Sequence, residues 1–156
     1  MSLDKEWYYK VTADWSELPA CLEYFSGEAV EARKELGMKG RLETHAAKIP
    51  VVTEHRFAQL QILNAIVKYF EIERDKIKAT HYRKYLEGYN KVLSSRDAEK
   101  YADGEKDVVD LEMLINEICM VRNLFTGIIK GLDNKSYTIN NVARLRSAGL
   151  EDATLE

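Results

Sequence analysis

Proline and glycine are scarce in this chain, which has two prolines and eight glycines among 156 residues. This composition leaves little material for flexible linkers, while an apolar content of 46% is enough for one hydrophobic core. We therefore predict a single domain over residues 1–156. No apolar run approaches the roughly 18 residues of a membrane-spanning helix, and no segment typical of a signal peptide opens the chain. These absences predict a cytoplasmic protein without membrane contact.

Residues of common catalytic and metal sites are sparse as well. Two cysteines, Cys21 and Cys119, lie far apart at positions that look apolar, which predicts reduced thiols in the core. His45, His55 and His81 have none of the spacings that bind zinc or di-iron centres, and the chain has no glycine-rich phosphate loop. We therefore expect no metal, no cofactor and no enzymatic activity.

Negative charge prevails over the whole chain, whose net charge is −3, but positive charge gathers in one segment. Residues 74–96 hold seven basic and two acidic residues, a balance of +5, so the rest of the chain sums to −8. The basic residues are Arg74, Lys76, Lys78, Arg83, Lys84, Lys91 and Arg96. This segregation favours a local surface for a polyanion over a protein coated with nucleic acid on all sides.

Apolar residues recur at helical spacing through most of the chain, and strand signals are almost absent. The spacing holds from Leu18 to Leu36, with Pro19 in the expected first turn, which predicts a helix there. The first fifteen residues are rich in aromatic side chains, so they form either an extended arm or a segment that packs on the helices. Residues 1–44 are therefore predicted to be an N-terminal arm and helix.

The core is predicted over residues 50–149 as a long antiparallel helical hairpin. A short helical piece over 41–47 leads to Pro50. Thr53 is then suited to cap a helix that continues without proline or glycine to about Glu87. At 1.5 Å per residue, this one helix is about 50 Å long.

A polar connection over residues 94–107, with at most one helical turn, is predicted to lead into a second long helix over 107–131. Gly131 is expected to end that helix, and Thr138 to cap a short last helix that stops at Gly149. The predicted fold class is therefore all-α, with shorter helices beside the hairpin, in a bundle that forms oligomers.

The second long helix carries a heptad seam, in which apolar residues step alternately by three and four positions. Arg122 interrupts it, either as a residue that fixes register through an ion pair or as an arginine that reaches water at the seam's edge. A second apolar row broadens this face, so the helix is suited to contact its hairpin partner and a neighbouring subunit together. The residues predicted to serve oligomerisation are Leu111, Ile115, Ile118, Arg122, Phe125 and Ile129.

Residues 79–96 combine tyrosines with basic side chains. Three of the tyrosines are spaced to share one helix face, which is usual for core residues, although exposed tyrosines also stack on the bases of single strands. An acidic partner protein would satisfy the same charge pattern. The residues predicted to contact nucleic acid are Lys76, Lys78, Arg83, Lys84, Lys91, Tyr82 and Tyr89.

Three motifs follow one another in the C-terminal part of the chain: HYRKYLEGY, KYADGEKDVV and NKSYTINN. Together with KIP at residues 48–50, they resemble the UvsY-type recombination mediators of tailed phages over residues 48–146. Within the last motif, the positions that match the family pattern are Asn134, Lys135, Tyr137, Ile139 and Asn141.

The resemblance implies a protein that binds single-stranded DNA and forms ring-like homo-oligomers. It also implies that the protein helps to load a recombinase onto strands coated by single-strand-binding protein, in the host cytoplasm. By position, it places the DNA contacts on Arg83 and Lys84 and assigns the heptad-seam helix to assembly. The alternative is a helical phage structural or interaction protein that binds no nucleic acid.

Overall fold

The computed structural model of the chain describes residues 2–89 and 91–149, and every regular element within them is helical. The elements are α1 (Leu3–Ala13), the short 3-10 helix η1 (Trp15–Glu17), α2 (Leu18–Lys34), α3 (Leu42–Gly88), α4 (Ser95–Asp103) and α5 (Lys106–Ser147). The predicted all-α class is therefore confirmed. Residues 150–156, which the predicted domain includes, lie outside the described residues. Among the described helices, none has the length and apolar character to cross a membrane.

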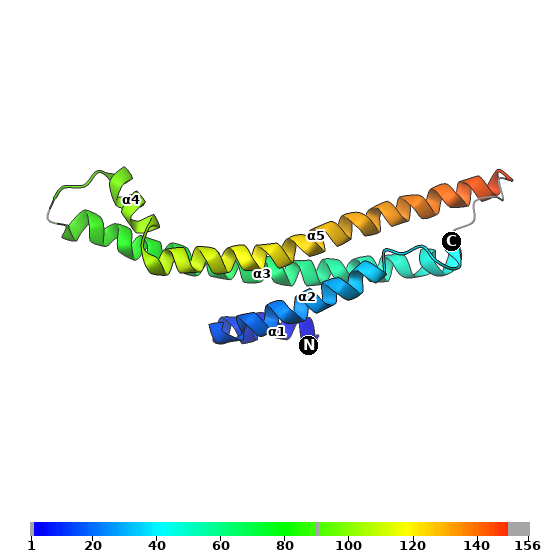
Figure 1. Cartoon of the computed structure of the whole chain (residues 1–156), viewed down its shortest axis with the longest axis horizontal. Coiled ribbons are helices and arrows are strands. Elements are labelled where there is room, and N and C mark those ends of the chain that lie inside the picture. Colours follow the sequence, from blue (N-terminus) through cyan, green and yellow to red (C-terminus); the bar gives the residue numbers. More distant parts are fainter. Residues whose placement is uncertain (1, 90, 150–156) are drawn as a thin grey trace.

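Helices α3 and α5 form a long antiparallel hairpin that runs the length of the molecule (Figure 1). They contain 47 and 42 residues, which correspond to about 70 and 60 Å of helix. Their facing apolar residues are removed from water, as the helical spacing predicts. The buried residues in the middle of the hairpin include Leu60, Leu63, Ile66, Val67 and Phe70 of α3 and Leu111, Ile115 and Ile118 of α5.

The N-terminal residues form helix α1, so the prediction of an extended arm is wrong and the alternative, packing on the helices, is confirmed. Acidic residues in its first turn, Asp4 and Glu6, favour helix formation because they face the positive end of the helix dipole. Val11 is fully buried in the main core, and Trp7 and Tyr8 pack against it. Helices α1 and α2 thus cover one side of the hairpin (Figure 1).

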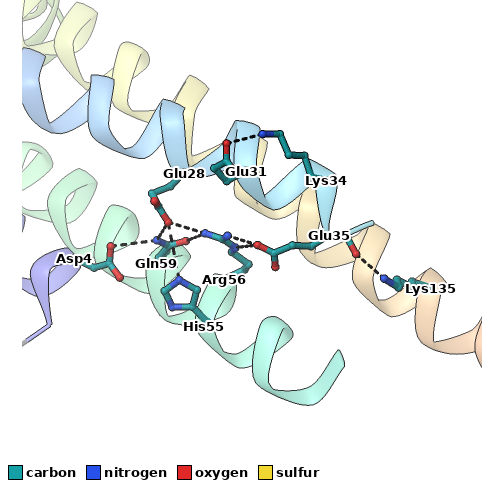
Figure 2. A network of polar contacts seen from close by, with 9 residues as sticks. All are labelled: Asp4, Glu28, Glu31, Lys34, Glu35, His55, Arg56, Gln59 and Lys135. Carbon is teal, nitrogen blue, oxygen red and sulfur yellow. Dashed lines mark hydrogen bonds and ion pairs between the residues drawn. The ribbon is translucent and has the colours of Figure 1, made fainter. Parts of the chain in front are cut away.

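A buried polar network joins these N-terminal helices to α3 (Figure 2). The Arg56 guanidinium donates hydrogen bonds to the carboxylates of Glu28 and Glu35 and to the side-chain oxygen of Gln59. Gln59, which is fully buried, donates in turn to Glu28 and to Asp4 of α1, at 2.8 and 3.1 Å. Each of these polar groups has a partner, so the network holds three helices together rather than presenting a reactive group.

Helix α3 begins earlier than predicted, at Leu42, and passes through Pro50 without a break. The expectation of a separate piece over 41–47 followed by a cap at Thr53 is therefore wrong. Proline in a helix interior removes one hydrogen bond and costs about 3 kcal/mol. Here the first turns are held by tertiary contact, because Leu42 is buried in a small second core with residues of α5.

Helix α5 is also continuous, so the predicted stop at Gly131 and the predicted cap at Thr138 are wrong. A methyl group on Gly131 would lie 2.8 Å from the Leu36 side chain, so glycine permits close packing here. The Thr138 hydroxyl donates to the Asn134 carbonyl within the helix instead of capping a new one. Buried residues such as Leu132 continue the packed face of α5 beyond the glycine.

The buried face of α5 departs from the predicted heptad seam after Ile118. Val121 and Ile128 are buried, whereas Arg122 and Ile129, each one position later, lie at the edge. Helix α2 contacts α5 in this region, with the rings of Phe25 and Phe125 centred 6.1 Å apart. The second apolar row therefore contributes to the core here, because α5 packs against two helices. The Arg122 guanidinium bonds to neighbouring Asn123 and forms no interhelix ion pair among the described residues.

Four of the residues predicted to form an oligomer interface are buried inside the chain itself: Leu111, Ile115, Ile118 and Phe125. They pack against α3 and α2, so they present no surface to a second copy. Their assignment to oligomerisation is therefore wrong. Ile129, which is half-buried and packs on the same core, is also part of the chain's own packing.

Candidate nucleic-acid interface

The predicted nucleic-acid contacts lie at one end of the hairpin, where α3 ends, α4 crosses and α5 begins (Figure 1). We call residues 74–89 and 91–110 the hairpin tip. Helix α4 is longer than the single turn predicted for this connection. Ser94 caps it by accepting a hydrogen bond from the Asp97 backbone N–H, and Ala98 and Ala102 are fully buried. A packed helix, rather than an open loop, thus covers one side of α3.

Two basic residues of the tip are already matched by carboxylates of α4 and α5. Lys78 points toward α4, where its ammonium lies 2.6 Å from Asp103 and 3.8 Å from Glu99. The hydrogen bond to Asp103 raises the pKa of Lys78. Arg74 reaches across to Glu112 of α5 at 2.8 Å. Lys78 was predicted to contact phosphates, but the structure places its charge in an internal ion-pair cluster.

A second group of basic residues lies on the other side of α3. Because successive residues turn by about 100° around a helix, Lys76, Arg83 and Lys84 point away from Lys78. Lys76 pairs with Glu73 at the surface, 2.9 Å away. Arg83 and Lys84 are exposed, line a surface groove with Glu87, and have no ion pair with any residue that the structure describes.

The connection that follows α3 adds two more available cations. Lys91 and Arg96 are exposed, and neither forms an ion pair within residues 2–89 and 91–149. Arg96 lies in the first turn of α4. Residues 83–89 and 91–96 of the tip therefore present four exposed basic side chains that no carboxylate of the described chain neutralises: Arg83, Lys84, Lys91 and Arg96. Lys100 and Lys106, which lie within the acidic segment, are also exposed and form no ion pair with a described residue.

The tyrosines of the tip have different environments. Tyr82 is half-buried beside Lys78, and the half-buried Tyr85 donates its hydroxyl to Glu105, a hydrogen bond that raises the pKa of Tyr85. Tyr89 stacks on Tyr101 of α4, with ring centroids 6.4 Å apart and planes inclined by 26°. Both stacked rings remain about half exposed.

Tyr101 belongs to this aromatic cluster, although the sequence pattern did not predict it. Its partner Tyr89 is twelve positions earlier, and the two rings meet only because α4 folds back on α3. The sequence signal available was weak: an aromatic residue in a polar segment whose alanines repeat at helical spacing. Tyr89 and Tyr101 form the tip's exposed aromatic surface.

The fold also brings acidic residues to the basic segment. Residues 97–110 contain six acidic and two basic residues, a balance of −4, and they pack beside the +5 segment over 74–96. The charge segregation seen along the sequence is therefore much weaker in space. The segregation that remains depends on side-chain direction. Asp103 and Asp107 pair with Lys78 and His81 on the side of α3 that faces α4 and α5, whereas Arg83 and Lys84 pair with no described acidic residue.

Comparison with protein families, with characterised proteins and with solved structures finds no match for this chain. Its own side chains therefore carry the functional argument. Among these, the tip combines exposed cations with exposed aromatic rings, whereas the buried network around Arg56 is satisfied internally. The tip also joins His81, Glu105 and Asp107, which the sequence separates widely.

Proposed function

We propose that the chain is a non-enzymatic accessory protein that binds single-stranded DNA at the hairpin tip. The observation that carries this proposal is the set of four exposed basic side chains without ion pairs within residues 83–96, namely Arg83, Lys84, Lys91 and Arg96, on the same tip as the stacked rings of Tyr89 and Tyr101. When cations that no carboxylate neutralises bind phosphates, counterions condensed on the nucleic acid are released, and this release favours binding. Aromatic faces bind bases of any sequence by stacking.

Within this proposal, the role is that of a recombination mediator. The support comes from the resemblance of residues 48–146 to UvsY-type mediators, in which Arg83 and Lys84 occupy the DNA-contacting positions. A recombinase and a single-strand-binding protein are then the expected protein partners, and a homo-oligomer the expected state. An oligomer interface would have to use surface residues, because the heptad seam is occupied inside the chain.

Salt dependence of binding tests the basic residues. We expect a fluorescent oligothymidine to bind with an affinity that falls steeply as salt rises. The double variant Arg83→Gln/Lys84→Gln should make the log–log slope shallower by about 1.4, since each phosphate contact to a single strand contributes about 0.7. The matched control is Arg33→Gln/Lys34→Gln, which removes an adjacent exposed Arg–Lys pair at the end of α2. No binding by the unmodified protein at low salt would overturn the proposal.

Aromatic stacking is tested separately with Tyr89→Ala. Each base stacked on an aromatic side chain contributes about 1–3 kcal/mol, so we expect affinity for the same oligonucleotide to fall by about tenfold. Tyr9→Ala is the matched control, because Tyr9 and Tyr89 are each 51% exposed and Tyr9 lies on α1. An equal loss in both variants would contradict a stacking role at the tip.

A second candidate function is protein docking without nucleic acid. The outer face of α5 favours it, since Met113 and Met120 are seven positions apart and more than 60% exposed. Methionines adapt well to partner surfaces. If this alternative holds, the unmodified protein will not bind the oligonucleotide even at low salt.

A further inference from the structure

Three potential metal ligands meet at the corner where α3 passes the start of α5. His81 lies near the end of α3, Glu105 immediately precedes α5, and Asp107 lies in its first turn. One nitrogen or oxygen from each of the three residues lies within 4.8 Å of the others. This arrangement is formed by the tertiary fold, because the histidine is separated from the carboxylates by more than twenty residues.

The two ring nitrogens of His81 have different surroundings. The Nε2 atom lies 2.9 and 3.0 Å from the two carboxylate oxygens of Asp107, which assigns it the proton and makes it the donor. The Nδ1 atom is buried and has no hydrogen-bond partner. In the described residues, the only other buried side-chain nitrogen or oxygen without a partner belongs to Trp7.

The unpartnered nitrogen faces a carboxylate. The distance from His81 Nδ1 to Glu105 Oε1 is 3.8 Å, which is too long for a hydrogen bond. With the proton on Nε2, both facing atoms offer lone pairs, so their contact is unfavourable unless a positive group lies between them. Ligands about 2.0–2.1 Å from a tetrahedral zinc ion are about 3.4 Å apart, close to the separation seen here.

We propose that His81 Nδ1 and the Glu105 carboxylate bind a divalent transition-metal ion of the zinc class at this corner. Asp107 is the positioning residue, since a carboxylate that accepts the other ring N–H fixes the tautomer of a metal-binding histidine. The Tyr85 hydroxyl donates to Glu105 and orients that ligand in the same way. Water completes the coordination shell. The site does not depend on nucleic-acid binding.

The donor atoms determine which ions the site takes. An imidazole nitrogen together with a carboxylate favours zinc and its neighbours in the transition series, whereas magnesium prefers oxygen ligands only. Because the ligands come from α3 and from the residue before α5, a bound ion connects the two long helices at the tip. This connection adds to the ion pairs that Lys78 and Arg74 make there.

The test follows the imidazole nitrogens of the full-length protein by ¹⁵N NMR while zinc chloride is added. Cys119 is replaced by serine in every sample, because a half-buried free thiol competes for added zinc. We expect a saturable shift of the His81 Nδ1 signal with zinc and no shift with magnesium. Glu105→Gln, which keeps an acceptor for Tyr85, should weaken zinc binding at His81 at least tenfold, and Asp107→Ala about 10- to 100-fold.

His55→Gln is the matched control, because His55 is an exposed histidine 4.0 Å from Glu28 and far from the tip. Its removal should leave zinc binding at His81 unchanged. A His81 Nδ1 signal that zinc does not move would overturn the proposal, as would zinc affinity that Glu105→Gln leaves intact. A signal that responds to pH alone would show that a proton, not a metal ion, occupies the space. Circular dichroism of each variant confirms that it is folded.

Discussion

Loss of the Arg56 side chain should lower the free energy of unfolding, because Arg56 is the buried cation of the polar network. Its side chain is 6% exposed and is the cation for two carboxylates, Glu28 and Glu35. Removing one partner of a buried ion pair costs about 3–5 kcal/mol, because the remaining charge stays buried. Both carboxylates keep some access to water, so we expect Arg56→Ala to lower the free energy of unfolding by about 3 kcal/mol. Urea unfolding followed by circular dichroism measures the change.

Lys34→Ala provides the control for this prediction. Lys34 also forms an ion pair, with Glu31, but both side chains are more than half exposed. Exposed ion pairs contribute about 0–1 kcal/mol, so the loss should stay below about 1 kcal/mol. If both variants lose the same stability, burial of the Arg56 network contributes nothing.

Periodicity identifies buried apolar residues well but identifies polar partners poorly. Leu111, Ile115 and Ile118 stand at predicted apolar positions and are buried. The hydrogen bonds of Gln59 were not predicted, because its partners Asp4 and Glu28 come from two other helices. Spacing along one helix contains no information about which carboxylate of another helix lies nearby.

At the scale of the element, the two prolines allow a direct test of where α3 begins. Pro50 lies inside α3, where it lacks the N–H that would bond to the preceding turn. We expect Pro50→Ala to raise the free energy of unfolding by about 2 kcal/mol. Removing the proline regains about 3 kcal/mol, which is the cost of a proline inside a helix. Alanine also makes the unfolded chain more flexible, which lowers the free energy of unfolding by up to about 1 kcal/mol. Thermal and urea unfolding measure it.

Pro19 is the control, because it lies at the start of α2, where its missing N–H has no partner within the helix. Pro19→Ala should lower stability by less than about 1 kcal/mol through the unfolded state alone. A destabilised Pro50→Ala variant would indicate that the helix starts after Pro50, as the sequence alone predicts.

The existence of the long helices was predictable, but their ends were not. Pro50 and Gly131 are local signals for a helix stop, and both lie inside continuous helices. In each case tertiary packing outweighs local preference. Leu42 is buried before the proline, and Leu132 is buried directly after the glycine. The predicted end of α3 near Glu87 is confirmed: the helix ends at Gly88, and the nearest described residues after it, Tyr89 and Lys91, are exposed.

At the scale of the whole molecule, the hairpin determines which charges remain available. The +5 balance of residues 74–96 is a property of the sequence, and folding places a −4 segment beside it. Lys78 is thereby matched, whereas the exposed Arg83 and Lys84 are not. The charge cluster is visible in the sequence, but which of its side chains meet a carboxylate depends on how α4 packs. The same packing assembles the proposed metal ligands.

The elongated shape is itself a prediction that scattering can check. A compact chain of this length has a radius of gyration of about 15 Å, whereas a rod as long as α3, about 70 Å, has one of about 20 Å or more. We expect small-angle X-ray scattering of the monomer to give the larger value. The molar mass from light scattering must accompany it, because an oligomer would also raise the radius. A monomer near 15 Å would mean that the hairpin folds back on itself in solution. The tip would then not project from the rest of the chain, which is the geometry that a strand needs in order to reach Arg83 and Lys84.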